Sequence, residues 1–144
     1  MKLREIMTRQ VIRIHPEEPV AVAARMMTQY NVGLLPVCGR DGRLLGVVTD
    51  RDMVVRCLAS GRDPERTRVD RVMTPGVIAA SADTDGAAAA RVMAGKQIRR
   101  LPVTENGRLC GMVSLGDLVR SAETAYDAGD ALAEISAGVS NREF

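Results

Sequence analysis

The chain contains the stretch GVVTDRD at residues 46–52 and a near-copy, GMVSLGD, at residues 111–117. In both stretches a run of strand-forming residues ends at a hydroxyl residue, and an Asp follows three positions later. These residues are Thr49 and Asp52 in the first copy, and Ser114 and Asp117 in the second. This spacing is typical of a helix N-terminus, where both side chains cap free backbone N–H groups. Each stretch therefore predicts a strand that leads directly into a helix.

The two stretches belong to an internal repeat that covers most of the chain. At an offset of 66 residues, MT at 7–8 aligns with 73–74 and LPV at 35–37 aligns with 101–103. The offset becomes 65 after a turn that reads GRDGR in the first copy and ENGR in the second. Asp-Gly and Asn-Gly are favoured in tight hairpins. The second copy is therefore one residue shorter within a turn, where a deletion does not move the flanking strands.

Each copy predicts the order β-α-β-β-α. The expected segments of the first copy are strand 11–14, helix 19–30, strand 34–37, strand 44–48 and a helix over 50–60 that Gly61 stops. Those of the second copy are strand 77–80, helix 84–96, strands 100–103 and 109–113, and helix 115–122. The fold class is therefore α/β (α+β), with two repeats that we expect to pack about a pseudo-twofold axis around a cleft lined by equivalent residues.

The repeat also sets the expected domain boundaries. Repeat 1 spans 1–60, a polar linker 61–66, repeat 2 spans 67–122, and a tail spans 123–144. Short amphipathic pieces, LREIMT and VDRVMT, precede the two first strands and are expected to bridge the copies. Thr67 and Asp70 resemble a capping box for the second piece. In the tail, the pattern from Ala125 to Ile135 is compatible with a helix, and GVSNREF is expected to be frayed.

Composition excludes several classes of function. A net charge of +2 gives no general attraction to nucleic acid or to an anionic membrane, and aromatic residues make up only 2%. No run reaches the roughly 18 apolar residues of a membrane span, and no signal sequence is evident, so we expect a cytoplasmic protein. The three cysteines lack C-x-x-C spacing, which favours neither a disulfide framework nor a metal site. The single histidine, His15, is expected to lie at a surface turn.

The repeated motifs M-T-x-x-V-I, (R/L)-L-P-V and G-h-V-(T/S)-x-x-D, where h is apolar, resemble those of a tandem pair of CBS domains, a Bateman module, over about residues 1–122. The chain is also similar to small stand-alone CBS proteins, including actinobacterial hypoxic-response proteins. The resemblance implies a regulatory module that binds an adenosine-containing ligand in the cleft between the repeats. AMP, ADP, ATP, S-adenosylmethionine and NAD are such ligands, and CBS pairs often form homodimers.

The resemblance also implies roles for particular residues, beside which a purely structural role stays open. Asp52 and Asp117 would accept hydrogen bonds from ribose hydroxyls, as acidic residues do in other nucleotide sites, with Thr49 and Ser114 near the phosphate or ribose; helix capping is the other role of these four residues. The adenine slot would include apolar residues that could equally belong to the core. The candidate contacts for the base are Val11, Ile12, Val77, Ile78, Pro36 and Pro102, with Thr8 and Thr74 beside them.

The two copies differ where Gly33 and Leu34 align with Arg99 and Arg100. Arginine forks suit phosphate oxygens, so these two residues are candidate phosphate contacts, or else solvated side chains beside a strand. We therefore expect two unequal ligand sites, with the one supported by Arg99 or Arg100 favouring phosphates.

Three functions are compatible with these sequence features. The first is a non-enzymatic sensor that requires no cofactor and changes an unknown partner protein when a nucleotide binds. The second is a ligand-free module for dimerisation or interaction. An enzyme is third, because the chain has no P-loop, no H-E-x-x-H motif, and its two Asp residues lie in separate repeats.

Overall fold

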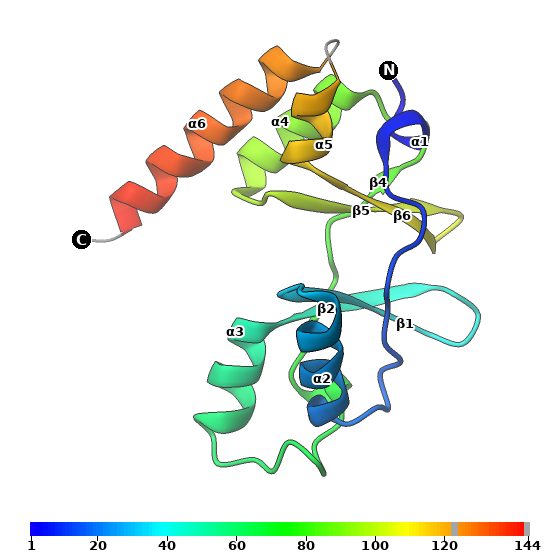
Figure 1. Cartoon of the computed structure of the whole chain (residues 1–144), viewed down its shortest axis with the longest axis vertical. Coiled ribbons are helices and arrows are strands. Elements are labelled where there is room, and N and C mark those ends of the chain that lie inside the picture. The colour runs from blue at the N-terminus through cyan, green and yellow to red at the C-terminus, as the bar shows by residue number, and fades with distance from the viewer. Residues whose placement is uncertain (122–123, 143–144) are drawn as a thin grey trace. The chain divides into compact units, whose positions relative to one another are not determined.

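The computed structural model describes residues 1–121 and 124–142, which form two compact units (Figure 1). The repeat-1 unit contains Ile12–Val77 and Gly107–Leu109, and the repeat-2 unit contains Met1–Val11, Ile78–Asn106 and Cys110–Phe144. Each has a three-stranded sheet with helices packed on it, so the mixed α/β fold class is confirmed. Neither described part contains a helix that is both long enough and apolar enough to cross a membrane.

The repeat-1 unit is built on a sheet of order β1-β2-β3. Its elements are α2 (Val20–Tyr30), β1 (Leu34–Cys38), β2 (Leu44–Thr49), α3 (Asp50–Met53), the π-helix η1 (Val54–Leu58), the 3-10 helix η2 (Val69–Arg71) and β3 (Thr74–Pro75). Strands β1 and β2 form the predicted antiparallel hairpin. The helix predicted over 50–60 is thus α-helical only in its first turn and widens to π geometry before Gly61, whose φ of 75° ends it.

The repeat-2 unit has a sheet of order β4-β5-β6. Its elements are α1 (Leu3–Ile6), β4 (Ala80–Ser81), α4 (Gly86–Lys96), β5 (Arg100–Glu105), β6 (Arg108–Ser114), α5 (Leu115–Arg120) and α6 (Ala125–Arg142). The turn between β5 and β6 has positive φ at Asn106 and Gly107, as the Asn-Gly dipeptide predicts. Strand β4 runs parallel to β5, which requires the helical crossover that α4 provides.

The first strand of each repeat is shorter than predicted. Over residues 11–14 only Ile14 forms a bridge, to Val37. In the second copy the corresponding pairing is limited to Ala80 and Ser81. Polar or turn residues follow both positions, so the backbone leaves the sheet after one or two residues.

The short pieces that precede the first strands fold with the other repeat. Residues 74–75, which belong to repeat 2 in sequence, pair with Val47 and Gly46 as strand β3 of the repeat-1 unit. Conversely, Thr8 pairs with Met112 in the repeat-2 unit through two backbone hydrogen bonds of 2.8 and 3.0 Å. The repeats are therefore units of sequence, whereas each compact unit is completed by a segment from the other repeat.

The glycine that opens each repeated motif permits this exchange. A Cβ atom on Gly46 would overlap the carbonyl oxygen of Thr74, and one on Gly111 would overlap the Met7 sulfur and lie 3.0 Å from the carbonyl oxygen of Thr8. Only a residue without a side chain allows the exchanged segment to cross the strand this closely. The two glycines therefore share one role, which is to permit the close approach of the exchanged segment.

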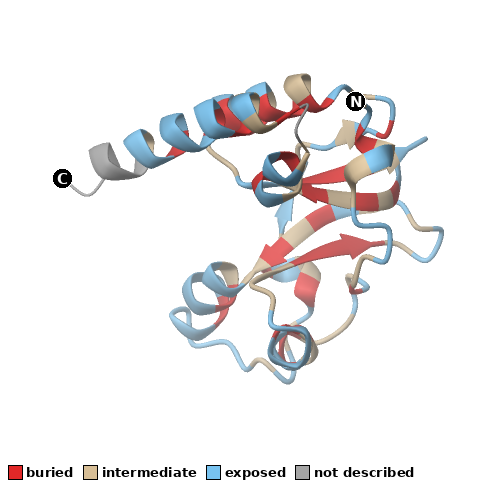
Figure 2. Cartoon of the chain, turned by 45° about the horizontal axis from the view of Figure 1, so that its top comes forward, coloured by how far each residue is buried: buried red, intermediate tan, exposed pale blue. Residues whose placement is uncertain are grey.

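The exchanged N-terminal segment is anchored in the core of the repeat-2 unit. Leu3, at the start of α1, is 0% exposed and packs in one cluster with Met93, Leu101 and Leu118. Figure 2 shows buried residues along the strands and on the helix sides that face them. A separate cluster, which includes Val37, fills the repeat-1 unit.

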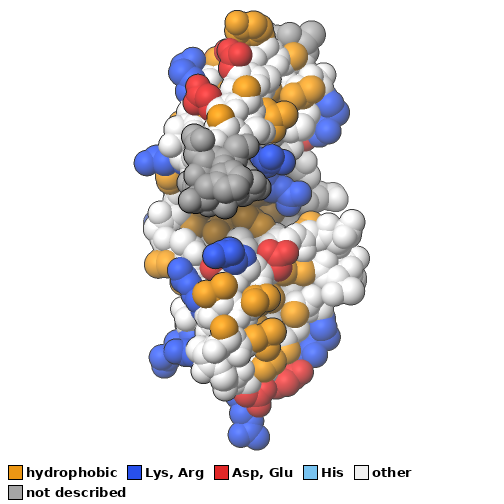
Figure 3. All heavy atoms as spheres, turned by 90° about the vertical axis from the view of Figure 1, so that its left-hand side faces the viewer, with side chains coloured by type: hydrophobic (Ala, Val, Ile, Leu, Met, Phe, Trp, Pro, Cys, Tyr) orange, Lys and Arg blue, Asp and Glu red, His pale blue; other side chains and the backbone are white. Residues whose placement is uncertain are grey.

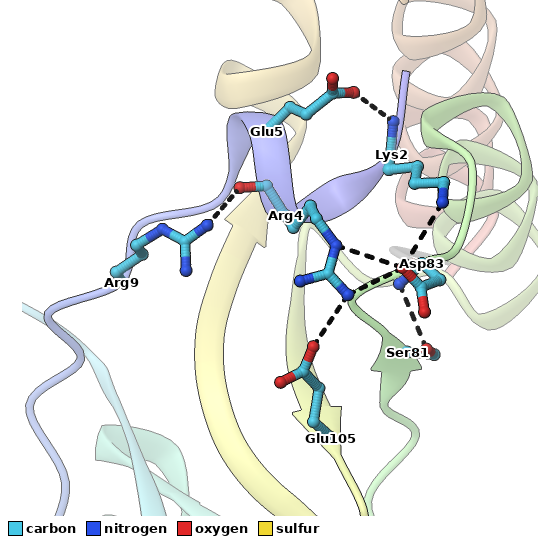
Figure 4. A network of polar contacts seen from close by, with 7 residues as sticks. All are labelled: Lys2, Arg4, Glu5, Arg9, Ser81, Asp83 and Glu105. Carbon is cyan, nitrogen blue, oxygen red and sulfur yellow. Dashed lines mark hydrogen bonds and ion pairs between the residues drawn. The ribbon is translucent and has the colours of Figure 1, made fainter.

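Charged contacts around α1 fix the same segment from outside (Figure 4). The Arg4 guanidinium donates to Asp83 at 2.7 Å and to Glu105 at 2.9 Å. The hydrogen bond from Arg4 lowers the pKa of Asp83, and one from the N-terminal ammonium of Met1 lowers the pKa of Asp85. Because these folded pKa values are lowered, the contacts stabilise the unit above the ordinary carboxyl range and are lost as the pH falls through the lowered values.

Two further expectations differ from the structure. The capping box predicted at Thr67 and Asp70 is wrong: the Thr67 hydroxyl donates to the carbonyl of Asp63 at 2.7 Å, and Asp70 pairs with Arg68. The tail helix extends beyond the predicted Ile135 to Arg142, into the segment expected to be frayed, while residues 143–144 lie outside the described part. Helix α6 packs on α4 and α5 through Ala128, Ala131 and Ile135.

Replacing Leu3 by Ala should destabilise the repeat-2 unit, because it leaves a cavity in the core. The expected loss in the free energy of unfolding is about 2–4 kcal/mol, measured by urea unfolding. The matched control is Leu132→Ala on α6, since Leu132 is 40% exposed. A Leu3→Ala variant as stable as the control would contradict the anchoring of α1 in this core.

Candidate functional site

The predicted capping geometry is present at the start of α3 in the repeat-1 unit. The Asp52 backbone N–H donates to the Thr49 hydroxyl at 3.0 Å, and the Thr49 N–H donates to Asp52 Oδ2 at 3.0 Å. The Asp52 side chain is only 12% exposed. Its second oxygen, Oδ1, lies 3.9 Å from the Arg56 guanidinium and is not used by the cap.

Arg56 connects this carboxylate to the exchanged segment. Its guanidinium donates to the carbonyl of Met73 at 3.1 Å, and the next residue is Thr74 in β3. The hydroxyl cap, the carboxylate and Thr74 therefore lie in one region of the repeat-1 unit, although Thr74 belongs to the other repeat in sequence.

The repeat-2 unit contains the same arrangement at the start of α5. The Asp117 N–H donates to the Ser114 hydroxyl at 3.1 Å, and the Ser114 N–H donates to Asp117 Oδ2 at 2.8 Å. Asp117 is also 12% exposed, and its Oδ1 accepts from Arg120. An open hollow of about 420 Å³ lies beside it, lined by Met1, Ile6, Asp117, Arg120 and Ser121.

The charge next to the two caps is opposite. The Leu115 N–H, in the first turn of α5, donates to the carbonyl of Arg99 at 3.0 Å, which places the Arg99–Arg100 pair directly beside the cap. Both arginines are exposed, and neither has an ion pair among the described residues. At the equivalent place in the repeat-1 unit, the Asp50 N–H donates to Gly33, and the Asp50 carboxylate packs over that glycine.

The remaining candidates divide between the units. Thr8 and Thr74 are exposed, and each lies in the unit of the opposite repeat. Val11 and Ile78 fall in the repeat-2 unit, and Ile12 and Val77 in the repeat-1 unit; all four are partly buried. Ile12 and Ile78 pack against the cores of their units, whereas Pro36 and Pro102 are buried within central positions of β1 and β5.

The cysteines and the histidine form no site with these residues. Cys38 and Cys57 are buried, and burial raises the pKa of the Cys38 thiol. His15 is exposed and its carbonyl accepts from the Glu18 N–H at 3.2 Å, so it lies at a surface turn as expected, with its Nδ1 3.1 Å from the carbonyl oxygen of Cys38. Over residues 1–121 and 124–142, no group of three or more His, Cys, Asp or Glu side chains is placed to hold a metal ion.

Sequence reasoning missed two features of these sites: a pair of arginines, and the unit in which Thr8 and Thr74 lie. Arg56 and Arg120 contact the free oxygens of the two carboxylates, and their spacing of four and three residues from Asp52 and Asp117 is visible in the sequence. The repeat alone did not predict that Thr8 and Thr74 each lie in the unit of the opposite repeat. Aligning two copies of a sequence does not show in which unit a bridging segment packs.

Comparison with known proteins gives a consistent result. The family model described as "CBS domain" matches residues 3–58 and again residues 69–123. The CBS domain-containing protein YhcV of Bacillus subtilis is 39% identical over 134 residues, which covers 93% of this chain and 94% of that protein. Hypoxic response protein 1 of Mycobacterium tuberculosis is 35% identical over 117 residues, 81% of this chain and 82% of that protein.

Solved structures show the same likeness. Hypoxic Response Protein I, with two coordinated zinc ions, superimposes with a TM-score of 0.77 at 34% identity, covering 83% of this chain and 98% of that chain. CBSX2 in complex with AMP gives 0.74 at 28% identity, covering 87% and 98%. The CBS domain pair of MJ0100, with 5′-methylthioadenosine and S-adenosyl-L-methionine, gives 0.72 at 26%, covering 83% and 94%. The predicted resemblance is confirmed.

Removing either capping hydroxyl should weaken its unit. Thr49→Ala and Ser114→Ala each lose an N-cap hydrogen bond and should lower the free energy of unfolding by about 1 kcal/mol, measured by chemical unfolding. Thr49→Ser keeps the hydroxyl and should restore most of the loss. Thr28→Ala, at an exposed position inside α2, is the control for loss of a hydroxyl away from a cap. Equal effects at Thr28 and Thr49 would argue against the capping role.

Proposed function

The chain belongs to the CBS-domain family as a tandem pair, and from that premise we propose that it is a non-enzymatic regulatory module that binds an adenosine-containing ligand. The observation that carries the proposal is the repeated carboxylate. In both units an Asp at a helix start uses one oxygen for the cap and keeps the other beside an arginine. A cap alone needs only the first oxygen.

The second oxygen suits a ribose. A carboxylate accepts hydrogen bonds from two vicinal hydroxyls, whereas a phosphate next to the same group would be repelled. We assign this role to Asp52 and Asp117, with Thr49 and Ser114 beside the ribose or phosphate. Arg56 and Arg120 orient the carboxylates before a ligand arrives, which lowers the entropic cost of ordering the site on binding.

The charge difference between the units supports unequal sites. Arg99 and Arg100 lie next to the cap of the repeat-2 unit without ion-pair partners in the described chain, and guanidinium forks suit phosphate oxygens. Asp50 occupies the equivalent place in the repeat-1 unit and opposes a phosphate there. A nucleotide such as AMP or ATP should therefore prefer the repeat-2 unit, whereas the repeat-1 unit suits a ligand with less negative charge.

The apolar candidates remain proposed contacts for the base. Val11 and Ile78 would serve the repeat-2 unit, together with the buried Pro102 and the exposed Thr8. Ile12 and Val77 would serve the repeat-1 unit, together with the buried Pro36 and the exposed Thr74. Adenine fits an apolar slot in which backbone groups read its polar edge.

The ligands of similar proteins support this assignment. CBSX2 binds AMP, and the CBS domain pair of MJ0100 binds 5′-methylthioadenosine and S-adenosyl-L-methionine. These three ligands share adenosine and differ in the group attached to its ribose. Recognition through the ribose hydroxyls would accommodate all three. ADP, ATP and NAD carry the same adenosine part and remain candidates for this chain.

Regulation requires that the ligand bind one arrangement of the protein better than another. The partner that responds is a protein of unknown identity. We propose that the regulation takes place in the cytoplasm. Neither a catalytic step nor a resident cofactor is needed for this function.

A second candidate function is an interaction module, and one observation favours it. Val54, Val55 and Leu58 on the π-helical turn are 50–60% exposed, and Figure 3 shows hydrophobic side chains gathered over this part of the repeat-1 unit. Exposed apolar groups of this kind often mark a protein contact. A homodimer through such a surface is compatible with ligand binding, so this candidate is distinguished by whether ligands bind at all.

Isothermal titration calorimetry with AMP, ATP and S-adenosylmethionine tests the proposal. Asp117→Asn, which preserves shape, should weaken binding at the repeat-2 unit by about tenfold because a charged acceptor is lost. Replacing both Arg99 and Arg100 by Gln should weaken ATP and AMP more than S-adenosylmethionine, which carries no phosphate. The control is Arg40→Gln, an exposed arginine outside both sites.

Two outcomes would contradict parts of this account. If none of these ligands raises the melting temperature or gives a calorimetric signal, the interaction module becomes the better function. If the Arg99, Arg100 double variant keeps every nucleotide affinity, the assignment of phosphates to the repeat-2 unit is wrong.

A further inference from the structure

The segment between the repeats, expected to be a simple linker, is an ordered loop. Its carbonyls cap the first turn of α2: the Val20 N–H donates to Thr67 at 2.8 Å, and the Ala21 N–H donates to Pro64 at 2.9 Å. Within the loop, the Asp63 carbonyl accepts three hydrogen bonds, from the N–H groups of Arg66 and Thr67 and from the Thr67 hydroxyl. The Asp63 carboxylate accepts a fourth from the Glu65 N–H at 3.0 Å. The loop is therefore held by its hydrogen bonds to the start of α2 and by those within the loop.

This loop presents arginines to a common hollow. An open depression of about 400 Å³ in the repeat-1 unit is lined by Arg62, Asp63, Arg66, Thr67, Arg68 and Arg71. No equivalent of this loop exists in the second repeat, since the sequence after residue 122 does not repeat residues 61–66. The lining of the hollow includes neither capped carboxylate nor the arginine beside it, so the hollow is separate from those two sites.

The charges in the hollow are not balanced by its own carboxylates. Arg68 pairs with Asp70 at 2.8 Å, and Arg66 lies 3.9 Å from Asp63. Glu65 is directed to Arg25 at 3.2 Å. The guanidinium groups of Arg62 and Arg71 have no ion-pair partner in the part of the chain that the structure describes. Four arginines therefore line the hollow with one carboxylate, Asp63, while Asp70 outside the lining pairs with Arg68.

We propose that this hollow binds a compact, multiply charged phosphate anion. Several arginines on a fixed backbone frame can donate in pairs to neighbouring phosphate oxygens, and the rigid loop reduces the ordering cost. The Thr67 hydroxyl donates to the Asp63 carbonyl, so its role is to hold the loop that carries the arginines. The net charge of the whole chain is only +2, which disfavours a nucleic acid duplex, because a duplex requires an extended basic surface.

Calorimetry with inorganic triphosphate tests the proposal on the full chain. The background is Arg99→Gln with Arg100→Gln, so that the proposed nucleotide site does not contribute. Triphosphate should still bind in this background, and adding Arg62→Gln with Arg71→Gln should weaken it by about tenfold. The control pair, Arg40→Gln with Arg43→Gln, removes the same charge elsewhere on the repeat-1 unit and should have little effect. Affinity should fall as salt is raised.

Three results would overturn the inference. They are no triphosphate binding in the background, an equal loss from the control pair, and tighter binding of a short DNA duplex through the same arginines. In the chain with Arg99 and Arg100 intact, Arg62→Gln with Arg71→Gln should leave AMP affinity unchanged. The hollow and the adenosine sites can therefore fail or succeed independently.

Discussion

Close crossing of two backbones at Gly46 and at Gly111 is the constraint on which the rest of the structure depends. At each place a segment from one repeat passes the second hairpin strand of the other repeat with no room for a side chain. The crossing adds an outer strand or bridge to each sheet and brings Leu3 or Val69 into the adjoining core. Neither repeat has a complete sheet and core without the exchanged piece.

The same crossing forms the candidate sites. Strand β2 and strand β6 each run past the glycine to a hydroxyl cap three residues later, so the exchanged segment and the capped Asp are neighbours. In the repeat-1 unit Arg56 makes the connection explicit by joining Asp52 to the carbonyl of Met73. The two candidate sites therefore share one arrangement. They differ in local charge, which is negative at Asp50 in the repeat-1 unit and positive at Arg99 and Arg100 in the repeat-2 unit.

Much of the fold was predictable because the sequence pattern of each helix and strand occurs twice, once in each repeat. The hairpins, helices α2 and α4, and both capping boxes follow from local patterns, since apolar spacing and turn dipeptides act over a few residues. The exchange of Thr8 and Thr74 was not predictable, because it depends on contacts between distant segments. The same reason explains Thr67, whose hydroxyl bonds to Asp63 in the loop rather than capping η2.

The candidate site was predictable in its residue types and less so in its grouping. Asp52, Asp117 and their hydroxyl partners form the capping boxes that the motif predicted. The arginines beside the two carboxylates, Arg56 and Arg120, were not predicted, and the expected linker is an ordered loop lined by arginines.

Two-dimensional amide NMR during titration with AMP tests the proposed grouping of these residues most directly. This grouping predicts that the signals of Thr8 move together with those of Ser114 and Asp117. Movement of Thr8 with Thr49 and Asp52 instead, or no movement at either cap, would contradict it.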